Sequence, residues 1–229
     1  MFYQPGVSDH GLPFDPFKAC VVPRAIGWIS SVSADGEHNL APYSQFTNVG
    51  FDPPMVMFSA NQTLDGGRKD TVNNVERTGV FCWQLATYAL RDAVNVSAEA
   101  VGPDEDEFAR AGLEKTWSRG LKTPVPMVAA SPVRFECEYL QTVRLPTNPP
   151  PAGAVDVVFA RVVGVHVDES VLTAGRIDVA KTNPIARLGY FEYGVVRESF
   201  EMIIPGDKRI LIGLEGKPGK PNDEGPKGA

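Results

Sequence analysis

The chain has 229 residues, of which 43% are hydrophobic and 22% are charged, and its formal net charge is −6. This composition is typical of a globular protein of one large or two small domains, and it excludes wholesale disorder and disulfide-rich or collagen-like chains. The negative charge argues against nucleic-acid binding, because such a surface has to neutralise backbone phosphates with cations.

Short apolar segments separated by glycine and proline predict a mainly β fold. Residues 25–32 are rich in β-branched and aromatic residues and predict a strand. An Asp-Gly pair at 35–36 favours a hairpin turn, with a return strand over residues 39–49. Asp-Pro-Pro at 52–54 interrupts the chain, and residues 55–59 predict a buried strand.

Helices are predicted in the middle of the chain, where the spacing of apolar residues changes. Val72 and Val75 lie three residues apart within residues 69–78, and Gly79 follows, which is the pattern of a short helix ended by glycine. Beyond it we expect a strand and two further helices: residues 80–85, 88–100 and 104–111.

A long antiparallel hairpin is predicted from two alternating segments, residues 133–145 and 155–167. In the first segment, one face carries Val133, Phe135, Cys137 and Tyr139, and the other carries Arg134, Glu136 and Glu138. In the second, one face carries Val157, Phe159, Val163, Val165 and Val167. A further strand is expected over residues 193–200. We expect one domain over residues 1–204 and a partly disordered extension over residues 205–229.

Three separated cysteines, Cys20, Cys82 and Cys137, fit neither a disulfide framework nor a zinc site. Residues 1–17 lack the pattern of a signal peptide, and no apolar run reaches the ~20 residues that cross a bilayer. We therefore expect a cytoplasmic protein that does not enter a membrane. Motifs of hydrolases and P-loop enzymes are missing, and His166, on a strand among valines, is interpreted as a structural histidine.

The stretch Asn39-Leu40-Ala41-Pro42-Tyr43-Ser44 is the first candidate site. Pro42 removes one backbone donor and indicates a sheet edge or a bulge. Exposed amides at such a break can bind a polar ring, and Tyr43 or Trp28 can pack on its flat face. On composition alone, an ordinary edge strand that follows a loop is the simpler interpretation.

The stretch Gly66-Gly67-Arg68-Lys69-Asp70-Thr71 is the second candidate. Glycines, two cations and a hydroxyl group before a helix start are the components of a phosphate site. The spacing differs from that of a P-loop, so the pattern fits a monophosphate. A solvated cationic loop with a helix cap explains the pattern equally well.

Seven segments in order resemble the flavin reductase-like family of FMN-binding split-barrel proteins, the flavoredoxin-type group. In sequence they are PRAIGWIS (23–30), NLAPYS (39–44), DPPMVMFS (52–59), KDT (69–71), EF with GL (107–113), SPV with EC (131–137) and GVHV (164–167), and a late ARLG (186–189) also matches. The resemblance covers residues 12–204. It implies a six-stranded Greek-key split β-barrel with short helical insertions, FMN as the cofactor, and a homodimer.

The resemblance also implies an activity and a set of binding residues. Proteins of this kind reduce flavin with NADH or NADPH, or pass electrons to partners such as two-component monooxygenases. It assigns the flavin ring to Asn39, Ala41, Pro42, Tyr43 and Ser44. It assigns the ribityl chain and phosphate to Ser59, Asn61, Arg68, Lys69 and Thr71, with Arg24 and Arg187 as further candidates. Hydride transfer to flavin needs no protein acid or base, so no catalytic residue is expected.

One departure from the family pattern keeps a second function open. Many relatives carry Gly-Gly where this chain has Gly189-Tyr190, and a tyrosine there can occupy the place of nicotinamide. The alternative is therefore an FMN-binding electron carrier or flavin store without nicotinamide turnover. A β-barrel that binds an oligonucleotide is a third hypothesis, and the charge of −6 argues against it.

Overall fold

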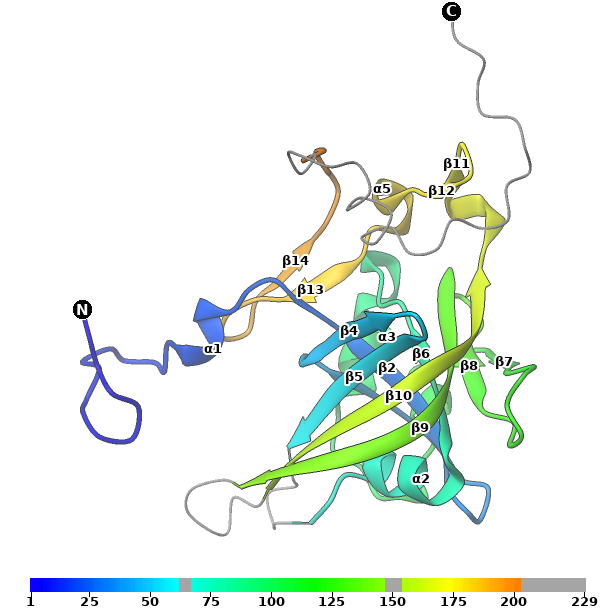
Figure 1. Cartoon of the computed structure of the whole chain (residues 1–229), viewed down its shortest axis with the longest axis horizontal. Coiled ribbons are helices and arrows are strands. Elements are labelled where there is room, and N and C mark those ends of the chain that lie inside the picture. Colours follow the sequence, from blue (N-terminus) through cyan, green and yellow to red (C-terminus); the bar gives the residue numbers. More distant parts are fainter. Residues whose placement is uncertain (62–66, 147–153, 203–229) are drawn as a thin grey trace, which may run out of the picture.

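The centre of the protein is one curled antiparallel sheet (Figure 1). The computed structural model describes residues 1–61, 67–146 and 154–202. The sheet order is β3-β2-β6-β9-β10-β5-β4. Its strands are β2 (Gly27–Val32), β3 (His38–Tyr43), β4 (Phe46–Phe51), β5 (Pro54–Asn61), β6 (Val80–Gln84), β9 (Val133–Pro146) and β10 (Ala154–Val167).

The connection between β3 and β4 makes this sheet a split barrel. These strands are the two edges of the sheet, yet only Ser44 and Gln45 separate them in the chain. The sheet therefore has to curl until its edges approach, and the Ser59 N–H on β5 donates to the Gln45 carbonyl at 2.9 Å. The predicted mainly β split barrel is confirmed. The described part of its sheet has seven strands rather than six, because the strand predicted over residues 39–49 is broken at this corner.

Alternate residues of the strands fill the barrel. Phe58, Phe81 and Val158 are fully buried in its main apolar cluster, and Ile29 joins them from β2. The predicted inward face of β9 is confirmed, since Val133 and Cys137 belong to this cluster and Phe135 and Tyr139 pack against it. The long antiparallel β9–β10 hairpin is confirmed as well.

The prediction that five named apolar residues share one face of β10 is wrong; they are Val157, Phe159, Val163, Val165 and Val167. Val158, Ala160 and Val162 point inward, so Val157 and Phe159 face outward. The pairing with β9 skips Val163, where a β-bulge adds one residue and reverses the alternation. After this bulge Val167 packs against the core.

Helix α2 (Asp70–Thr78) covers one end of the barrel (Figure 1) and packs against β2 and β3. Val72 and Val75 are fully buried, as the spacing predicts. Gly79 ends the helix in the left-handed region at φ 76°, and its N–H donates to the Val75 carbonyl at 2.9 Å.

A second layer covers the outer face of β9. It consists of β7 (Lys115–Trp117), β8 (Pro126–Val128) and the loop between them. Glu136 is therefore buried, with 1% of its surface exposed, although alternation places it on the outer face. Its carboxylate accepts the N–H groups of Arg119 and Gly120 at 2.7 Å each and bonds His166 Nε2 at 2.6 Å. His166 thus has the structural role expected for it.

A separate three-stranded sheet joins the N-terminal segment to the end of the domain. It contains β1 (Arg24–Ala25), β13 (Ile185–Arg187) and β14 (Tyr193–Val195), so the strand predicted over residues 193–200 is three residues long. The remaining elements are α1 (Phe17–Cys20), η1 (Tyr88–Leu90), α3 (Arg91–Val96), α4 (Glu107–Arg110), η2 (Glu169–Val171), β11 (Leu172–Thr173), β12 (Arg176–Ile177) and α5 (Val179–Thr182).

Two predicted helices are shorter than expected. Residues 88–100 form η1 and α3 and then leave the helical conformation after Val96, and residues 104–111 contain only the single turn α4. Among the described residues, no helix has the length and apolar character required to span a bilayer. Gly66 and the extension predicted over residues 205–229 lie outside the described residues.

Candidate functional site

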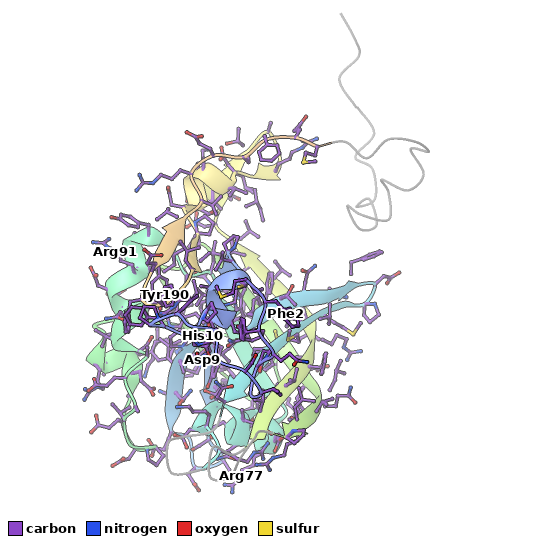
Figure 2. All side chains as sticks on the ribbon, turned by 90° about the vertical axis from the view of Figure 1, so that its left-hand side faces the viewer. Phe2, Asp9, His10, Arg77, Arg91 and Tyr190 are labelled. Atoms are coloured by element: carbon purple, nitrogen blue, oxygen red, sulfur yellow. The ribbon has the colours of Figure 1, made fainter. Side chains whose placement is uncertain are left out.

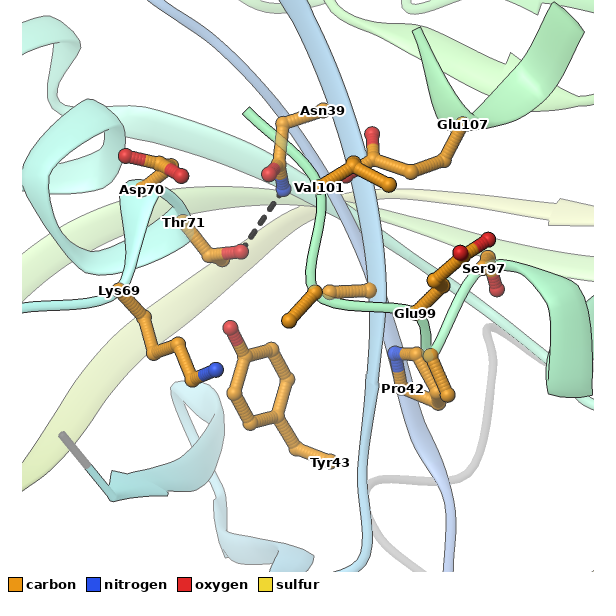
Figure 3. Close-up of a pocket in the computed structure, with 13 residues that line it drawn as sticks. Asn39, Pro42, Tyr43, Lys69, Asp70, Thr71, Ser97, Glu99, Val101 and Glu107 are labelled. Carbon is orange, nitrogen blue, oxygen red and sulfur yellow. Dashed lines mark hydrogen bonds between the residues drawn. The ribbon is translucent and has the colours of Figure 1, made fainter. Parts of the chain in front are cut away.

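Three separate segments meet around a pocket of about 130 Å³ (Figure 3). Strand β3 forms one wall, the start of α2 forms the second, and the segment after α3 forms the third. The lining residues are Asn39, Ala41, Pro42, Tyr43, Lys69, Asp70, Thr71, Ser97, Ala98, Glu99, Ala100, Val101 and Glu107. Six of the twelve predicted site residues are thus brought together: Asn39, Ala41, Pro42, Tyr43, Lys69 and Thr71.

Strand β3 presents a modified sheet edge to this pocket. Its residues pair with β2 on one side only, and Pro42 faces away from β2 with no N–H to offer. The neighbouring outward N–H, from Leu40, donates to the Glu107 carboxylate at 2.9 Å. Glu107 thereby ties α4 to β3. Burial raises the pKa of the Glu107 carboxyl group, and the Leu40 N–H partly opposes that shift.

Asn39 and Tyr43 connect β3 to the first turn of α2. The Asn39 side-chain amide donates to the Thr71 hydroxyl at 2.8 Å, as the dashed line in Figure 3 shows. The Tyr43 ring is 8% exposed and packs against Phe58, with 5.1 Å between ring centroids. Burial raises the pKa of the Tyr43 phenol, which therefore stays protonated. Tyr43 forms the floor of the pocket and has little free ring surface for a stacked ligand.

Lys69 supplies the positive charge of the pocket. It precedes α2 in an extended conformation, and its side chain points into the pocket (Figure 3). It provides no side-chain cap, and Asp70 and Thr71 of the first turn of α2 line the same pocket as Lys69. Glu99, on the opposite wall, forms a 2.6 Å ion pair with Arg110. An anion at this helix start would receive both the helix dipole and the lysine charge.

Arg68 is adjacent to Lys69 in the sequence but does not line the pocket. Its guanidinium bonds both oxygens of Glu76 at 2.7 Å and one oxygen of Asp156 at 3.1 Å. The structure therefore separates the two cations that the resemblance assigns together to the phosphate.

Three further predicted residues lie at the junction of the barrel edges, outside the pocket lining. Ser44 belongs to the corner between β3 and β4. Ser59 lies on β5, with its N–H bonded to the Gln45 carbonyl. Asn61 is exposed at the end of β5, where it pairs with Val155. All three are on the side of the barrel where β5 approaches β3.

Arg24 and Arg187 face each other on the small sheet and are used locally. Arg24 donates to backbone carbonyls of Lys18, Val21 and Leu188, which fasten α1 to β13. Arg187 donates to the Tyr193 hydroxyl at 2.8 Å and to the Tyr190 carbonyl. Figure 2 shows Tyr190 beside the N-terminal segment, whereas Arg77 of α2 lies at the lower end of the molecule.

The third wall of the pocket was not predicted. Residues 97–101 follow α3, whereas the helix predicted over residues 88–100 includes the first four of them. Ser97 Oγ accepts the indole N–H of Trp28 at 2.9 Å, and Trp28 is fully buried. Trp28 is therefore unable to stack on a ligand ring, contrary to the sequence-based expectation, and supports the wall from behind. The only signal that the sequence carries for this wall is three small residues after α3, Ser97, Ala98 and Ala100.

Fold and pocket together define a split-barrel protein with a ligand site between a sheet edge and a helix start. The flavin reductase like domain family matches residues 19–195 of this chain. The Bacillus subtilis protein YwrF is 33% identical over 187 residues, which is 81% of this chain and 89% of YwrF. The chain belongs to the flavin reductase-like family.

Solved structures agree with this assignment. Nitrilotriacetate monooxygenase component B from Bacillus cereus matches with a TM-score of 0.79 and 29% identity, over 88% of this chain and 98% of that chain. Flavoredoxin of Desulfovibrio vulgaris (Miyazaki F) shares the fold with a TM-score of 0.69 and 18% identity, over 90% of this chain and 98% of that chain.

Proposed function

We propose that this protein is an FMN-binding oxidoreductase that accepts hydride from NADH or NADPH and passes electrons to free flavin or to a partner. The observation that carries the proposal is the pocket in which Lys69 and the start of α2 meet the edge of β3. The family supports a flavin-related activity. A monooxygenase component among the similar structures supports an oxygenase as the electron acceptor.

The donor groups of the pocket fit the two ends of FMN. Lys69, Thr71 and the N-terminus of α2 would hold the phosphate, whose negative charge they complement. Asn39, Ala41 and Pro42 would border the ring, with Tyr43 beneath. When bound, FMN supplies a carbon-nitrogen ring system that accepts hydride, and the chain contributes orientation and shielding from water.

The size of the pocket indicates that one chain encloses only part of the cofactor. A volume of about 130 Å³ is below the roughly 300–1,000 Å³ of typical small-molecule sites. Ser44, Ser59 and Asn61, which lie beyond the pocket, remain proposed contacts for the rest of the molecule. Arg24 and Arg187 remain proposed contacts only through a partner chain.

The test is reconstitution of the purified protein with FMN. We expect a yellow protein whose flavin cannot be removed by gel filtration and which oxidises NADH or NADPH when free flavin is supplied. A protein that remains colourless after loading contradicts the whole proposal.

Tyr190 favours a second candidate function, an FMN-binding electron carrier. Its side chain is 47% exposed, its φ is +52°, and its ring lies 5.7 Å from that of Phe14. In this second proposal, the Tyr190 ring occupies the place of the nicotinamide. A flavin-loaded protein that a partner reduces, but that NADH and NADPH leave oxidised, identifies the carrier.

We further propose a homodimer formed through the outer face of β5 and β10. Met57 and Phe159 are directly paired there, with Met55 and Val157 beside them, and all four are only partly buried. Substitution of Met57 by glutamate should convert the dimer to a monomer, because burying an unpaired charge in an interface is unfavourable.

Light scattering coupled to gel filtration measures this change, and Ala109→Glu on exposed α4 is the control. A wild-type monomer, or a Met57→Glu protein that remains dimeric, contradicts this interface.

We also propose a cytoplasmic location, which the three unpaired cysteines support.

A further inference from the structure

Arg68 makes an unusually complete set of bonds for a residue at a predicted phosphate loop. Both terminal nitrogens bond Glu76 at 2.7 Å, and Nε bonds Asp156 at 3.1 Å. Three of the five N–H donors of the guanidinium therefore face carboxylates. Such a two-pronged arrangement is among the strongest ionic contacts that side chains form.

The partners of Arg68 belong to two different elements, helix α2 and strand β10. Glu76 lies in the second half of α2, and Asp156 lies on β10 with 2% of its surface exposed. Asp156 Oδ1 is buried without a hydrogen bond, and Arg144 Nε lies 3.9 Å from it. Asp156 therefore depends on Arg68 for its one hydrogen-bonded cation among the described residues.

We propose that Arg68 is a positioning residue, which locks the approach to α2 against the barrel so that Lys69 alone delivers charge to the pocket. This inference rests on the proposed FMN site. Lys69 directly follows Arg68, so fixing the Arg68 side chain to α2 and β10 fixes the backbone from which Lys69 projects. The role needs the shape of guanidinium as well as its charge, since an ammonium cannot bond two carboxylates in this geometry.

A direct phosphate contact by Arg68 would have to disrupt this arrangement. Moving the guanidinium toward the pocket would leave the buried Asp156 carboxylate without its hydrogen-bonded cation. It would also leave Glu76 without its bidentate partner. Leaving a buried carboxylate without its partner is strongly unfavourable. The two cations therefore have different roles: Arg68 positions the start of α2, and Lys69 binds the phosphate.

Four variants of the full chain separate positioning from phosphate binding: Arg68→Lys, Arg68→Met, Glu76→Gln and, as a control, Arg77→Met. Arg77 is an exposed cation on the same helix and lies outside the pocket lining. Quenching of flavin fluorescence gives the affinity of each apoprotein for FMN and for riboflavin, which lacks the phosphate. Thermal unfolding of the apoproteins provides a readout independent of flavin.

We expect Arg68→Lys, Arg68→Met and Glu76→Gln to weaken FMN binding by about tenfold and to leave riboflavin binding within about twofold, because Lys69 acts on the phosphate alone, with Arg77→Met close to wild type. The three variants should also unfold at a lower temperature. Glu76→Gln best distinguishes positioning from direct phosphate binding, because it frees the Arg68 side chain without removing the charge of Arg68. If Arg68 binds phosphate, this variant keeps or gains FMN affinity.

Several outcomes overturn the inference. In one, Arg68→Lys retains FMN binding while Arg68→Met loses FMN selectively. In another, the variants lose thermal stability but keep both affinities, which indicates a merely structural ion pair. If Arg68→Met fails to fold, Glu76→Gln still decides. A wild-type protein that binds neither flavin refutes the proposed function, and the inference falls with it.

Discussion

Replacement of Lys69 by methionine is expected to weaken FMN binding about 10- to 100-fold and to leave riboflavin binding within about twofold of wild type. The Lys69 ammonium points into the pocket at the start of α2 and is the one cation that lines it in the described part of the chain. A charge-assisted hydrogen bond contributes about 1.5–3 kcal/mol, and 1.4 kcal/mol corresponds to a tenfold change in affinity.

Fluorescence titration with both flavins measures this selectivity. Lys122→Met, an exposed lysine near the other end of α2, removes the same charge away from the pocket and serves as the control. Salt provides an internal check, because screening should weaken FMN binding to the wild type more than to the variant. An equal loss of FMN and riboflavin in Lys69→Met would falsify the phosphate assignment.

Substitution of Glu136 by alanine is expected to lower the free energy of unfolding by about 3–5 kcal/mol. The Glu136 carboxylate satisfies two backbone N–H groups of the loop between β7 and β8 and the ring of His166. Alanine leaves these donors without their acceptor in a buried place. Urea unfolding followed by tryptophan fluorescence measures the loss.

The same carboxylate gives the stability a defined pH dependence. Burial alone would raise the pKa of Glu136, but hydrogen bonds from Arg119, His166 and Gly120 outweigh it and lower the pKa below 4.5. A lowered folded-state pKa means that the contribution is complete above the unfolded pKa and is lost as the pH falls below about 4.5.

Two variants test this carboxylate. Glu136→Gln should lack this part of the acid sensitivity. Glu138→Gln, two residues along the same strand, removes an exposed ion pair with Arg161 and should cost less than about 1 kcal/mol. Equal losses for both sites would show that the buried bonds of Glu136 carry no special weight.

Local patterns predicted the elements whose structure depends on neighbouring residues. The strand β2, the turn after it, helix α2 and the β9–β10 hairpin follow from β-branched runs, an Asp-Gly pair and the spacing of Val72 and Val75. The split-barrel topology came from the family resemblance, because no local signal specifies which strands pair.

Features that depend on distant residues were missed. The break at Ser44 and Gln45 arises because β3 and β4 join opposite edges of the sheet, and the bulge at Val163 depends on pairing with β9. Glu136 is buried only because a separate hairpin covers it. Alternation of polar and apolar residues contains none of this information.

The candidate site was predicted in the same uneven way. The sequence placed β3 and the start of α2 as two candidate segments, and folding brings them together through the bond between Asn39 and Thr71. It did not separate Arg68 from Lys69, because the partners of Arg68 are eight and 88 residues away. Residues 97–101 are mostly small, and their one charged member, Glu99, pairs with Arg110, so the sequence did not indicate their place in the pocket.

The modified edge of β3 also has a consequence for self-association. An exposed strand edge invites another chain to extend the sheet, which is a common start of aggregation. Here proline removes one outward donor, and Glu107 occupies the next, at 2.9 Å. An incoming strand would therefore lack two successive backbone hydrogen-bond donors on β3. This edge of the candidate site is thereby protected from the growth of intermolecular sheets.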